Sequence, residues 1–331
     1  MQLNWPTFFE GIYLDLTSIF FLFFVLAVGL LSYFTPRKIR YIWLLACSYL
    51  FYWFSPESPV KNLLPLALLV GATLFSYWCA LVIELLSSKA LKRLFMLLPV
   101  LAGIGMLVLF KYYDFFAGGI ETLAGGSLAI SRPNLLLPLG ISYYTMQSIA
   151  YVCDVYNGTC PAEKNPLRYA LFVSFFPGIT GGPINRAASM LPQYKEPAAF
   201  SYNRVAGGLF RMLWGYFKFH VVAANIDIFT RTVFEKLSLT SGPAHMLAAL
   251  LYAYQVYINF SGCCDIGIGA AYALGFDFME NFNRPFAAKT FADLWKRWHI
   301  SLTTFFRDFM LPPPAWDRWK EKHPRIGGII S

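Results

Sequence analysis

The chain has 331 residues, of which 57% are hydrophobic and only 14% are charged. A soluble domain carries about 25% charged residues, so this composition excludes an ordinary water-soluble globular protein. The net charge of +9 does not indicate a nucleic-acid-binding protein, because the basic residues fall largely in short loops between apolar runs and no binding motif accompanies them. We therefore expect an integral membrane protein whose main partner is the lipid bilayer, with no nucleic acid.

Apolar runs recur along the chain, and a membrane-spanning helix needs about 20 apolar residues. We predict seven spans, at Thr17–Phe34, Tyr41–Phe54, Leu63–Leu86, Leu94–Phe116, Leu135–Tyr156, Gly207–Phe229 and His245–Phe260. Two shorter runs, Leu167–Phe176 and Ile266–Phe276, are expected to be re-entrant or packed within the protein. The first run lacks a basic preceding segment and a clear small-residue cleavage site, so we expect a retained anchor.

The loops predict the orientation of these spans. Thr35–Arg40 and Ser87–Arg93 each contain three basic residues, whereas Ser55–Asn62 contains one, and acidic Glu10 and Asp15 precede the first span. Because excess Lys and Arg mark the cytoplasmic side, the two basic loops should lie inside and the N-terminus outside. We expect a multi-pass protein of the cell membrane.

The two halves of the chain differ in character. Leucine-rich runs dominate residues 1–116, whereas Pro, Gly and polar residues interrupt the apolar runs of residues 135–331. Helix breakers at membrane depth are tolerated only where protein or a water-filled cavity satisfies the freed backbone groups. We expect a single membrane-embedded, all-α domain over 1–331, with N-terminal helices before a core of re-entrant or broken helices that encloses a chamber.

Phe175–Arg186 is the first candidate segment of that core. Two prolines and three glycines forbid a continuous helix, yet the segment is too apolar for an ordinary exposed loop. We predict a re-entrant or broken segment with Arg186 at its edge. The alternative is a tight turn between two helices.

Asn259–Gly269 is the second. An ionisable group such as Asp265 in an apolar stretch usually faces a cavity or a partner. The glycines allow close helix packing, and packing alone is the alternative explanation. No strand–helix unit surrounds Gly267 and Gly269, which argues against a dinucleotide-binding loop.

The third and richest candidate comprises Glu280–Phe286, Phe291–Leu302 and Phe305–Phe309. On a continuous helix, Trp295 and His299 are four residues apart and share a face. Such a helix, with a basic flank and an aromatic face, would lie in the membrane interface and could attract a phosphate-bearing acyl donor. The alternative is a surface anchor without chemistry.

Four histidines are candidates for a general base, because the unperturbed pKa of histidine is about 6.5. His299 has the most organised surroundings, His220 lies in an apolar run that could face a cavity, and His245 and His323 are expected to be structural. No histidine or cysteine spacing typical of a metal site occurs. We expect the six cysteines to be small packing residues.

The run Asn259–Asp308 resembles the membrane-bound O-acyltransferase family, particularly its alginate O-acetyltransferase branch. The family patterns Asn-Phe-Asn-x-Pro, Trp-x-x-Trp-His-Ile-Ser-Leu and Arg-Asp appear as Asn281–Pro285, Trp295–Leu302 and Arg307-Asp308. Leu137–Tyr144 and Ser174–Ile184 also look like this family, so the resemblance covers essentially the whole chain. The D-alanine transfer proteins of teichoic acid modification are a sister branch.

The resemblance implies many helices around a central tunnel, where a cytoplasmic acyl donor meets an extracytoplasmic acceptor. It implies acetyl-CoA or another acyl thioester as donor substrate, no permanently bound cofactor, a polysaccharide acceptor and an extracytoplasmic acetyltransferase partner. His299 matches the family's second histidine and is our candidate catalytic residue. Residues expected to line the tunnel or contact substrate are Asn281, Asn283, Arg284, Trp295, Arg297, Trp298, Asp308, Asp265 and Arg186.

The sequence departs from the family at two places. The family carries its principal histidine in a later Trp-His-Gly motif, which does not occur here, and Pro312–Pro314 replaces the usual Pro-Leu-Gly-Gly-Asn. We expect an O-acetyltransferase of a cell-surface polysaccharide, of which this chain is an N-terminal fragment. The alternative is a catalytically incomplete membrane scaffold or polysaccharide-export component; a transporter is less favoured, because paired broken helices are not evident.

Overall fold

The computed structural model describes residues 14–54, 63–125, 130–131 and 137–310, and all regular secondary structure within these ranges is helical. The all-α prediction is therefore confirmed. The expectations for the Ser55–Asn62 loop, Pro312–Pro314 and His323 concern residues outside those ranges. The chain divides into two compact units, which we call the first unit (Met1–Asp15, Phe34–Thr180 and Arg186–Pro197) and the second unit (Leu16–Tyr33, Gly181–Asn185 and Ala198–Ser331).

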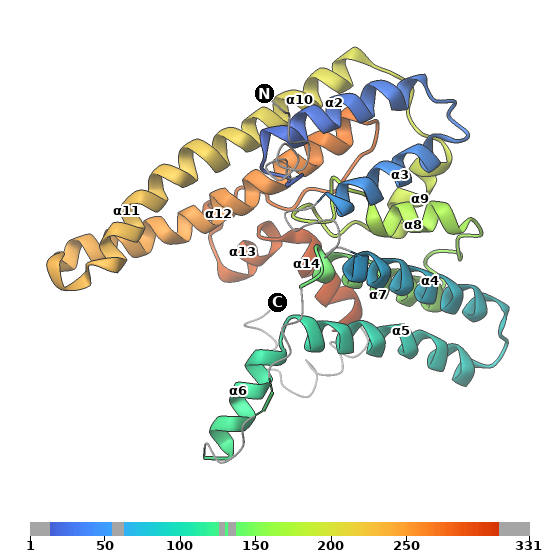
Figure 1. Cartoon of the computed structure of the whole chain (residues 1–331), viewed down its shortest axis with the longest axis horizontal. Coiled ribbons are helices and arrows are strands. Elements are labelled where there is room, and N and C mark those ends of the chain that lie inside the picture. Colours follow the sequence, from blue (N-terminus) through green and yellow to red (C-terminus); the bar gives the residue numbers. More distant parts are fainter. Residues whose placement is uncertain (1–13, 55–62, 126–129, 132–136, 311–331) are drawn as a thin grey trace, which may run out of the picture. The chain divides into compact units, whose positions relative to one another are not determined.

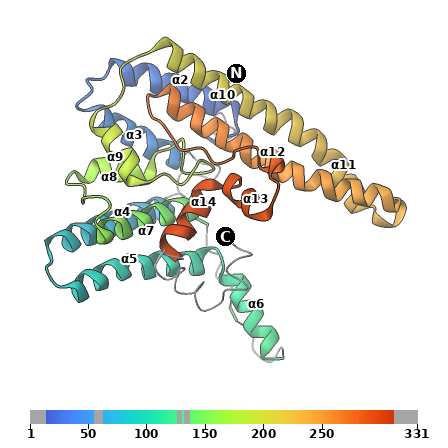
Figure 2. The same ribbon diagram turned by 180° about the vertical axis from the view of Figure 1, so that it is seen from behind.

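The first unit is built from α3 to α9. Their bounds are α3 (Arg40–Trp53), α4 (Leu63–Leu85), α5 (Lys89–Phe110), α6 (Tyr113–Leu123), α7 (Ile141–Asn157), α8 (Pro166–Ser174) and α9 (Ala187–Lys195). Helices α4, α5 and α7 lie side by side, as Figures 1 and 2 show. Helices α4 and α5 are long and apolar enough to cross a membrane.

Local signals explain several helix ends in this unit. Asn165 accepts backbone hydrogen bonds from Leu167 and Arg168, and Pro166 occupies the first helical position of α8. Gly140, at the start of α7, has φ +65°, and a Cβ there would lie 2.3 Å from the carbonyl oxygen of Ile179. Only glycine satisfies both constraints, so Gly140 lets the buried loop after α8 pass against α7.

That loop is the segment for which we predicted a broken conformation. Phe175–Asn185 contains no α-helix, and all of it but Thr180 is buried. The nitrogen of Phe176 donates a hydrogen bond to Ser48 Oγ at 3.3 Å. The prediction of a broken, non-helical segment is therefore confirmed, and the segment is buried.

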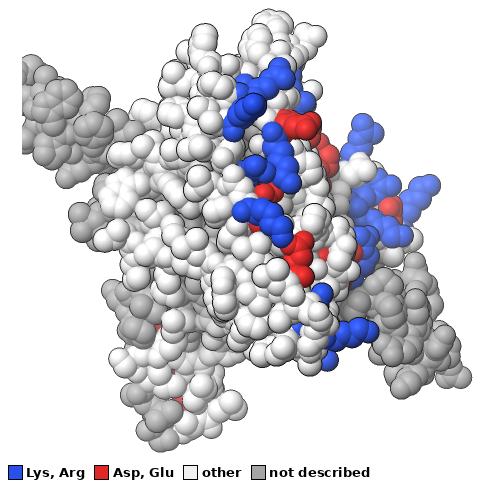
Figure 3. All heavy atoms as spheres, turned by 90° about the vertical axis from the view of Figure 1, so that its right-hand side faces the viewer, with Lys and Arg blue, Asp and Glu red and all other residues white. Residues whose placement is uncertain are grey.

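Several charged side chains of the first unit lie where α4 ends and α5 begins. Glu84 lies in the last turn of α4, Lys89 begins α5, and Lys164, just before α8, forms an ion pair with Glu84. Figure 3 shows a face on which basic and acidic side chains gather, while most of the described surface in view is uncharged. The apolar lengths of α4 and α5 therefore carry few charges.

The second unit contains most of α2 (Ile19–Phe34) and the helices that follow residue 198. These are α10 (Tyr202–Tyr216), η1 (Phe217–Ala223), α11 (Ala224–Glu235), η2 (Leu237–Leu239), α12 (Gly242–Ala273), η3 (Pro285–Ala287), α13 (Phe291–Arg297), α14 (Ile300–Phe305) and η4 (Phe306–Met310). The π-helical η1 joins α10 to α11 without a break, and α12 runs beside them in Figures 1 and 2.

Two glycine pairs bring α10 and α12 together. A Cβ on Gly208 would lie 2.5 Å from the carbonyl oxygen of Gly269, and one on Gly215 would lie 2.6 Å from that of Gly262. The backbones approach too closely for any side chain at these positions. The expectation that glycines of Asn259–Gly269 allow close helix packing is therefore confirmed for Gly262 and Gly269.

Of the two alternatives predicted for Ile266–Phe276, packing within the protein is confirmed. Helix α12 continues for 32 residues from Gly242 to Ala273, and most of Ile266–Phe276 is buried at its end, so this run is not a separate re-entrant segment. The glycines of α12 have no side chains, so helix α10 packs directly against the backbone of α12 at these positions. The tighter contact compensates for the low helix propensity of glycine.

Candidate functional site

His299 lies at a break between two short helices, and this corrects the continuous helix that we predicted. Helix α13 ends at Arg297, Trp298 is extended, and His299 adopts the left-handed conformation with φ 44° before α14 begins. Trp295 and His299 therefore do not share a helical face. A left-handed, non-glycine residue is uncommon and is held only where its surroundings determine it.

Asn281 supplies those surroundings. Its backbone oxygen accepts from the nitrogen of Ile300 at 2.9 Å, and its side-chain Oδ1 accepts from the nitrogen and Oγ of Ser301 at 3.2 and 2.9 Å. These bonds satisfy the first backbone donors of α14 and so begin a new helix at this point. Asn281 is fully buried, and its Nδ2 donates to Cys264 Sγ at 3.3 Å.

The side-chain amide of Asn281 also determines which ring nitrogen of His299 carries the hydrogen. The backbone N–H of Ser301 can only donate, so the Asn281 atom that it meets is the oxygen. That oxygen lies 3.1 Å from His299 Nδ1, which must therefore carry the hydrogen and donate it. The lone pair of the neutral ring is then on Nε2, which can accept a hydrogen bond from a hydroxyl group.

Burial keeps this ring neutral. The desolvation of His299 lowers its pKa from 6.5 to about 4, and the ring of Phe260 stands edge to face with it at 4.7 Å. Its segment consists of two helices of seven and six residues, neither long enough to span a bilayer. Near neutral pH, His299 is a hydrogen-bond acceptor rather than a cation.

Aromatic side chains enclose one side of the break. Trp298 contacts Tyr257, Phe282 and Phe286 with ring-centroid distances of 6.0, 5.3 and 6.4 Å. Trp295, in contrast, is 57% exposed among the described residues. The two tryptophans predicted to line the tunnel or contact substrate thus have different environments: Trp298 lies in the aromatic cluster, and Trp295 lies at the surface.

Asp265, on α12, is the centre of a cluster of charges. Its Oδ1 lies 3.0 Å from the guanidinium of Arg211, and its Oδ2 lies 2.6 Å from Lys218 Nζ. Arg211 also binds Glu280 through two hydrogen bonds of 2.6 Å. The two cations and two carboxylates balance, which is how membrane helices accommodate ionisable groups.

The predicted partner of Asp265 exists, but we did not identify it from the sequence. Arg211 and Lys218 lie seven residues apart in the predicted Gly207–Phe229 span, so they fall on one face two turns apart. Two cations on one face of an apolar run are the signal that could have found them. Glu280 carried no such signal, because it lies in a loop.

The other predicted residues are distributed around the break or apart from it. The nitrogen of Asn283 bonds the oxygen of Arg297 at 2.9 Å, and Arg297 Nε bonds Asp293 at 2.8 Å. Arg284 has φ 46° and precedes η3, while Asp308 is exposed and pairs with Arg307 at 2.9 Å. Arg186 belongs to the first unit, where its Nη1 lies 3.9 Å from Asp154 Oδ2, and the structure does not place it relative to His299.

Two further histidines have structural partners within the second unit. His220 Nε2 lies 2.7 Å from the oxygen of Thr17, and His245 Nε2 lies 2.6 Å from Thr240 Oγ1. All six cysteines are free thiols, and four of them are buried. Within the described ranges, no three His, Cys, Asp or Glu side chains are grouped to hold a metal ion.

Comparisons with known proteins identify the family. Residues 162–309 match the model of MBOAT, the membrane-bound O-acyltransferase family. The chain is 34% identical to the peptidoglycan O-acetyltransferase of Helicobacter pylori, over 91% of this chain and 62% of the relative. It is 35% identical to a probable alginate O-acetylase of Pseudomonas aeruginosa, over 88% of this chain and 55% of the relative.

A more distant relative is the teichoic acid D-alanyltransferase of Bacillus subtilis, 28% identical over 54% of this chain and 45% of the relative. The chain thus spans 62% and 55% of the lengths of the two O-acetylating relatives. The matched region contains the residues that shape the His299 site and the Asp265 cluster. The chain belongs to the membrane-bound O-acyltransferase family.

Proposed function

We propose that the protein transfers acetyl groups to hydroxyl groups of an extracytoplasmic polysaccharide. The named activities of the peptidoglycan and alginate relatives support this assignment. The observation that carries it is the His299 geometry, in which Asn281 orients the ring so that Nε2 presents its lone pair. A partly buried, neutral acceptor of this kind suits a hydroxyl substrate.

In this reaction the hydroxyl oxygen of the acceptor forms a bond to the carbonyl carbon of an acyl thioester. The carbon–sulfur bond breaks, the hydroxyl proton leaves the oxygen, and the sulfur departs as a thiol, so the products are an ester and a free thiol. We assign to His299 the orientation of the hydroxyl through Nε2. Its low pKa suits this role better than storing a proton, because a general base works best with a pKa near the working pH.

We propose acetyl-CoA or another acyl thioester as the donor, reaching a central tunnel from the cytoplasm, with no permanently bound cofactor. We also propose that nine residues line this tunnel or contact the substrate: Asn281, Asn283, Arg284, Trp295, Arg297, Trp298, Asp308, Asp265 and Arg186. The fully buried Asn281 acts through His299 and is a positioning residue. The extracytoplasmic acetyltransferase partner is likewise proposed from the family.

We also propose that the protein crosses the cell membrane several times with its N-terminus outside. The charged end of the first unit, where α4 ends and α5 begins, contains Lys89, Lys92 and Arg93. By the positive-inside rule this end faces the cytoplasm. A cysteine-labelling experiment with a membrane-impermeant reagent tests this, because a cysteine placed at Ser88 should react only after the membrane is opened.

The test of the activity uses the full-length gene product in membranes, with isotopically labelled acetyl-CoA and either peptidoglycan or alginate as acceptor. We expect label in one polysaccharide and a loss of roughly 10²-fold with His299→Ala, since misplacing a reactant costs about that much. His245→Ala, at one of the two histidines with structural partners, should retain the rate. A folded wild-type protein that labels neither polysaccharide would contradict the proposal and favour a non-catalytic scaffold.

A further inference from the structure

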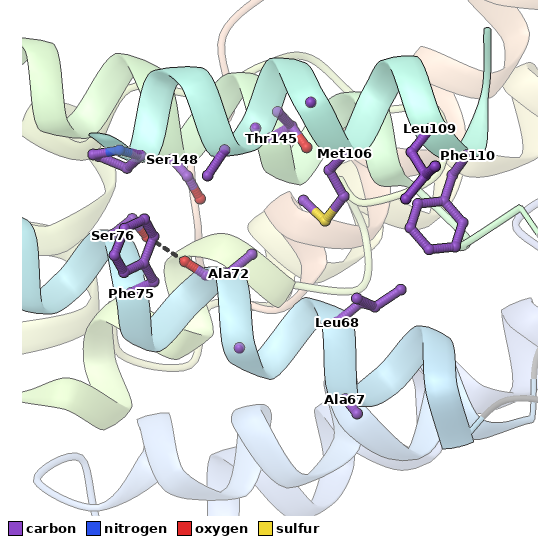
Figure 4. Close-up of a pocket in the computed structure, with 15 residues that line it drawn as sticks. Ala67, Leu68, Ala72, Phe75, Ser76, Met106, Leu109, Phe110, Thr145 and Ser148 are labelled. Carbon is purple, nitrogen blue, oxygen red and sulfur yellow. Dashed lines mark hydrogen bonds between the residues drawn. The ribbon is translucent and has the colours of Figure 1, made fainter. Parts of the chain in front are cut away.

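A cavity of about 430 Å³ lies among α4, α5 and α7 of the first unit, away from the residues described above. Figure 4 shows apolar side chains around it, including Leu68, Phe75, Met106 and Leu109. Its volume falls within the roughly 300–1,000 Å³ of small-molecule sites. An apolar lining of this extent selects a hydrocarbon ligand.

The cavity occupies one half of the membrane-spanning length. Its lining residues run from Ala67 to Ser76 on α4 and from Pro99 to Phe110 on α5. These are the first part of α4 and the last part of α5, so both lie away from the charged end at Glu84 and Lys89. A ligand here lies within one leaflet, and the positive-inside rule makes it the outer one.

Thr145 presents an unpartnered hydroxyl at this cavity. Its residue is 2% exposed, and its Oγ1 makes no hydrogen bond within the part of the chain that the structure describes. On the facing helix, Thr73 and Ser76 instead bond the carbonyl oxygens four residues earlier, at 2.7 and 2.8 Å. A buried hydroxyl in a helix usually bonds the carbonyl oxygen four residues earlier. Thr73 and Ser76 on α4 do so, and Thr145 does not. A ligand oxygen would provide the missing partner.

Two glycines keep the cavity open. Neither Gly71 nor Gly105 has any atom within 4 Å of where a Cβ would stand, although both line the cavity. Gly103 differs, because its Cβ would lie 2.8 Å from the Thr145 side chain and it therefore serves helix packing. Empty space beside apolar helices leaves the lining atoms without dispersion partners, so in a bilayer a lipid chain would fill it.

We propose that this cavity binds the acyl chain of a membrane glycerolipid, with an ester oxygen of that lipid accepting a hydrogen bond from Thr145. The chain lies between α4 and α5, the two described helices that are long and apolar enough to span a membrane. The lipid is a structural ligand of the first unit. Its binding does not depend on the acetyl-transfer chemistry proposed for the second unit.

The experiment uses full-length protein in membranes supplied with a glycerolipid whose acyl chain carries a photoreactive diazirine. After irradiation, we expect lipid-modified peptides from α4, α5 and α7. The double variant Gly71→Leu/Gly105→Leu fills the cavity and should lower this labelling by roughly tenfold or more, equivalent to one decade of affinity. Gly119→Leu on α6 is the matched control, because its Cβ also meets nothing within 4 Å and it does not line the cavity.

Thr145→Val tests the hydrogen bond separately while keeping the side-chain shape. We expect labelling to fall by roughly fivefold, the effect of one net hydrogen bond, and this readout stands even if the double variant fails to fold. Two results would overturn the proposal: labelling of α4, α5 and α7 that persists in a folded double variant, or no labelling of these helices in the wild type.

Discussion

Two pairs of neighbouring helices differ in where their charges lie: α4 and α5 of the first unit, and α10 and α12 of the second. In the first, the ion pair between Lys164 and Glu84 lies at a helix end, and the interior of α4 and α5 is apolar. In the second, Asp265 sits within α12, with its carboxylate 14% exposed between Arg211 and Lys218. Helices α4 and α5 therefore suit a lipid surrounding, whereas α10 and α12 keep charge within their packing.

These two helix pairs also differ in how closely their glycines are packed. Gly71 and Gly105 of the first unit have open space beside them, whereas Gly208 and Gly215 of the second stand against the backbone of α12. The second unit also contains a π-helical segment and two left-handed non-glycine residues, Arg284 and His299. Strained backbone and enclosed charge occur together where the matched family region has its polar residues, which is where function is expected.

The largest effect that this comparison predicts is that of Asp265→Ala. The change leaves Arg211 and Lys218 facing each other without the carboxylate between them, and breaking a buried pair costs about 3–5 kcal/mol. We expect a large loss of folded protein, measured by the unfolding temperature of the detergent-purified chain. Arg231→Ala is the control, because its pair with Asp227 is mostly exposed and should change stability little. An unchanged unfolding temperature for Asp265→Ala would show that the cluster contributes nothing to stability.

The next effect concerns the glycine contacts. Gly215→Ala places a methyl group 2.6 Å from the oxygen of Gly262, so α10 and α12 must separate, at a cost of about 1–3 kcal/mol. Gly119→Ala in the exposed part of α6 should instead stabilise by up to about 1 kcal/mol, because alanine favours helix more than glycine. Denaturation of both variants in the same detergent measures the difference. Equal stabilities would mean that the α10–α12 contact relaxes without cost.

The sequence predicts the first unit better than the second. Helix α4 was predicted at Leu63–Leu86 and lies at Leu63–Leu85, because an unbroken leucine-rich run specifies its own limits. Helix α5 begins at Lys89 rather than Leu94, since lysine forms helix well and hydropathy does not mark where a helix starts. The predicted Leu94–Phe116 span is also divided, because α5 ends at Phe110 and α6 starts at Tyr113.

The local structure of the second unit is harder to predict from the sequence, because it depends on residues that are distant in the chain. The continuity of α12 through Gly262 and Gly269 depends on glycines of α10, more than 40 residues earlier in the sequence. The break before His299 depends on Asn281, 18 residues away. Trp295 and His299 have the spacing of a helical face, so the local pattern could identify the important residues but not the conformation that positions them.

The third prediction uses the pH dependence of His299. Its pKa of about 4 keeps the ring neutral from pH 5 to 8, so acetyl transfer should not lose activity through this residue in that range. Asn281→Asp places a carboxylate beside Nδ1, and an opposite charge at this distance raises a histidine pKa by about 1–3 units. Protonated His299 cannot accept a hydrogen bond at Nε2, so the variant should lose activity as the pH falls below about 6.

A pH–rate profile of acetyl transfer by the full-length protein measures this shift, and Asn281→Ala supplies the comparison. The alanine variant removes the orienting oxygen without adding charge, so its rate should fall at every pH without a new acid limb. Identical profiles for Asn281→Asp and the wild type would contradict the contact between Asn281 and His299 as the determinant of the ring's protonation.

The smallest effect is expected at the ion pair of the first unit. Lys164→Gln removes a charge whose side chain is 68% exposed, and surface pairs contribute about 0–1 kcal/mol because water screens them. The backbone oxygen of Lys164 still accepts its hydrogen bond from Tyr77, since the substitution leaves the main chain intact. We expect an unfolding temperature close to that of the wild type, unaffected by added salt. A loss as large as that of Asp265→Ala would mean that an exposed ion pair at the end of α4 stabilises the protein as strongly as the enclosed charges between α10 and α12, and the contrast between these two helix pairs would not hold.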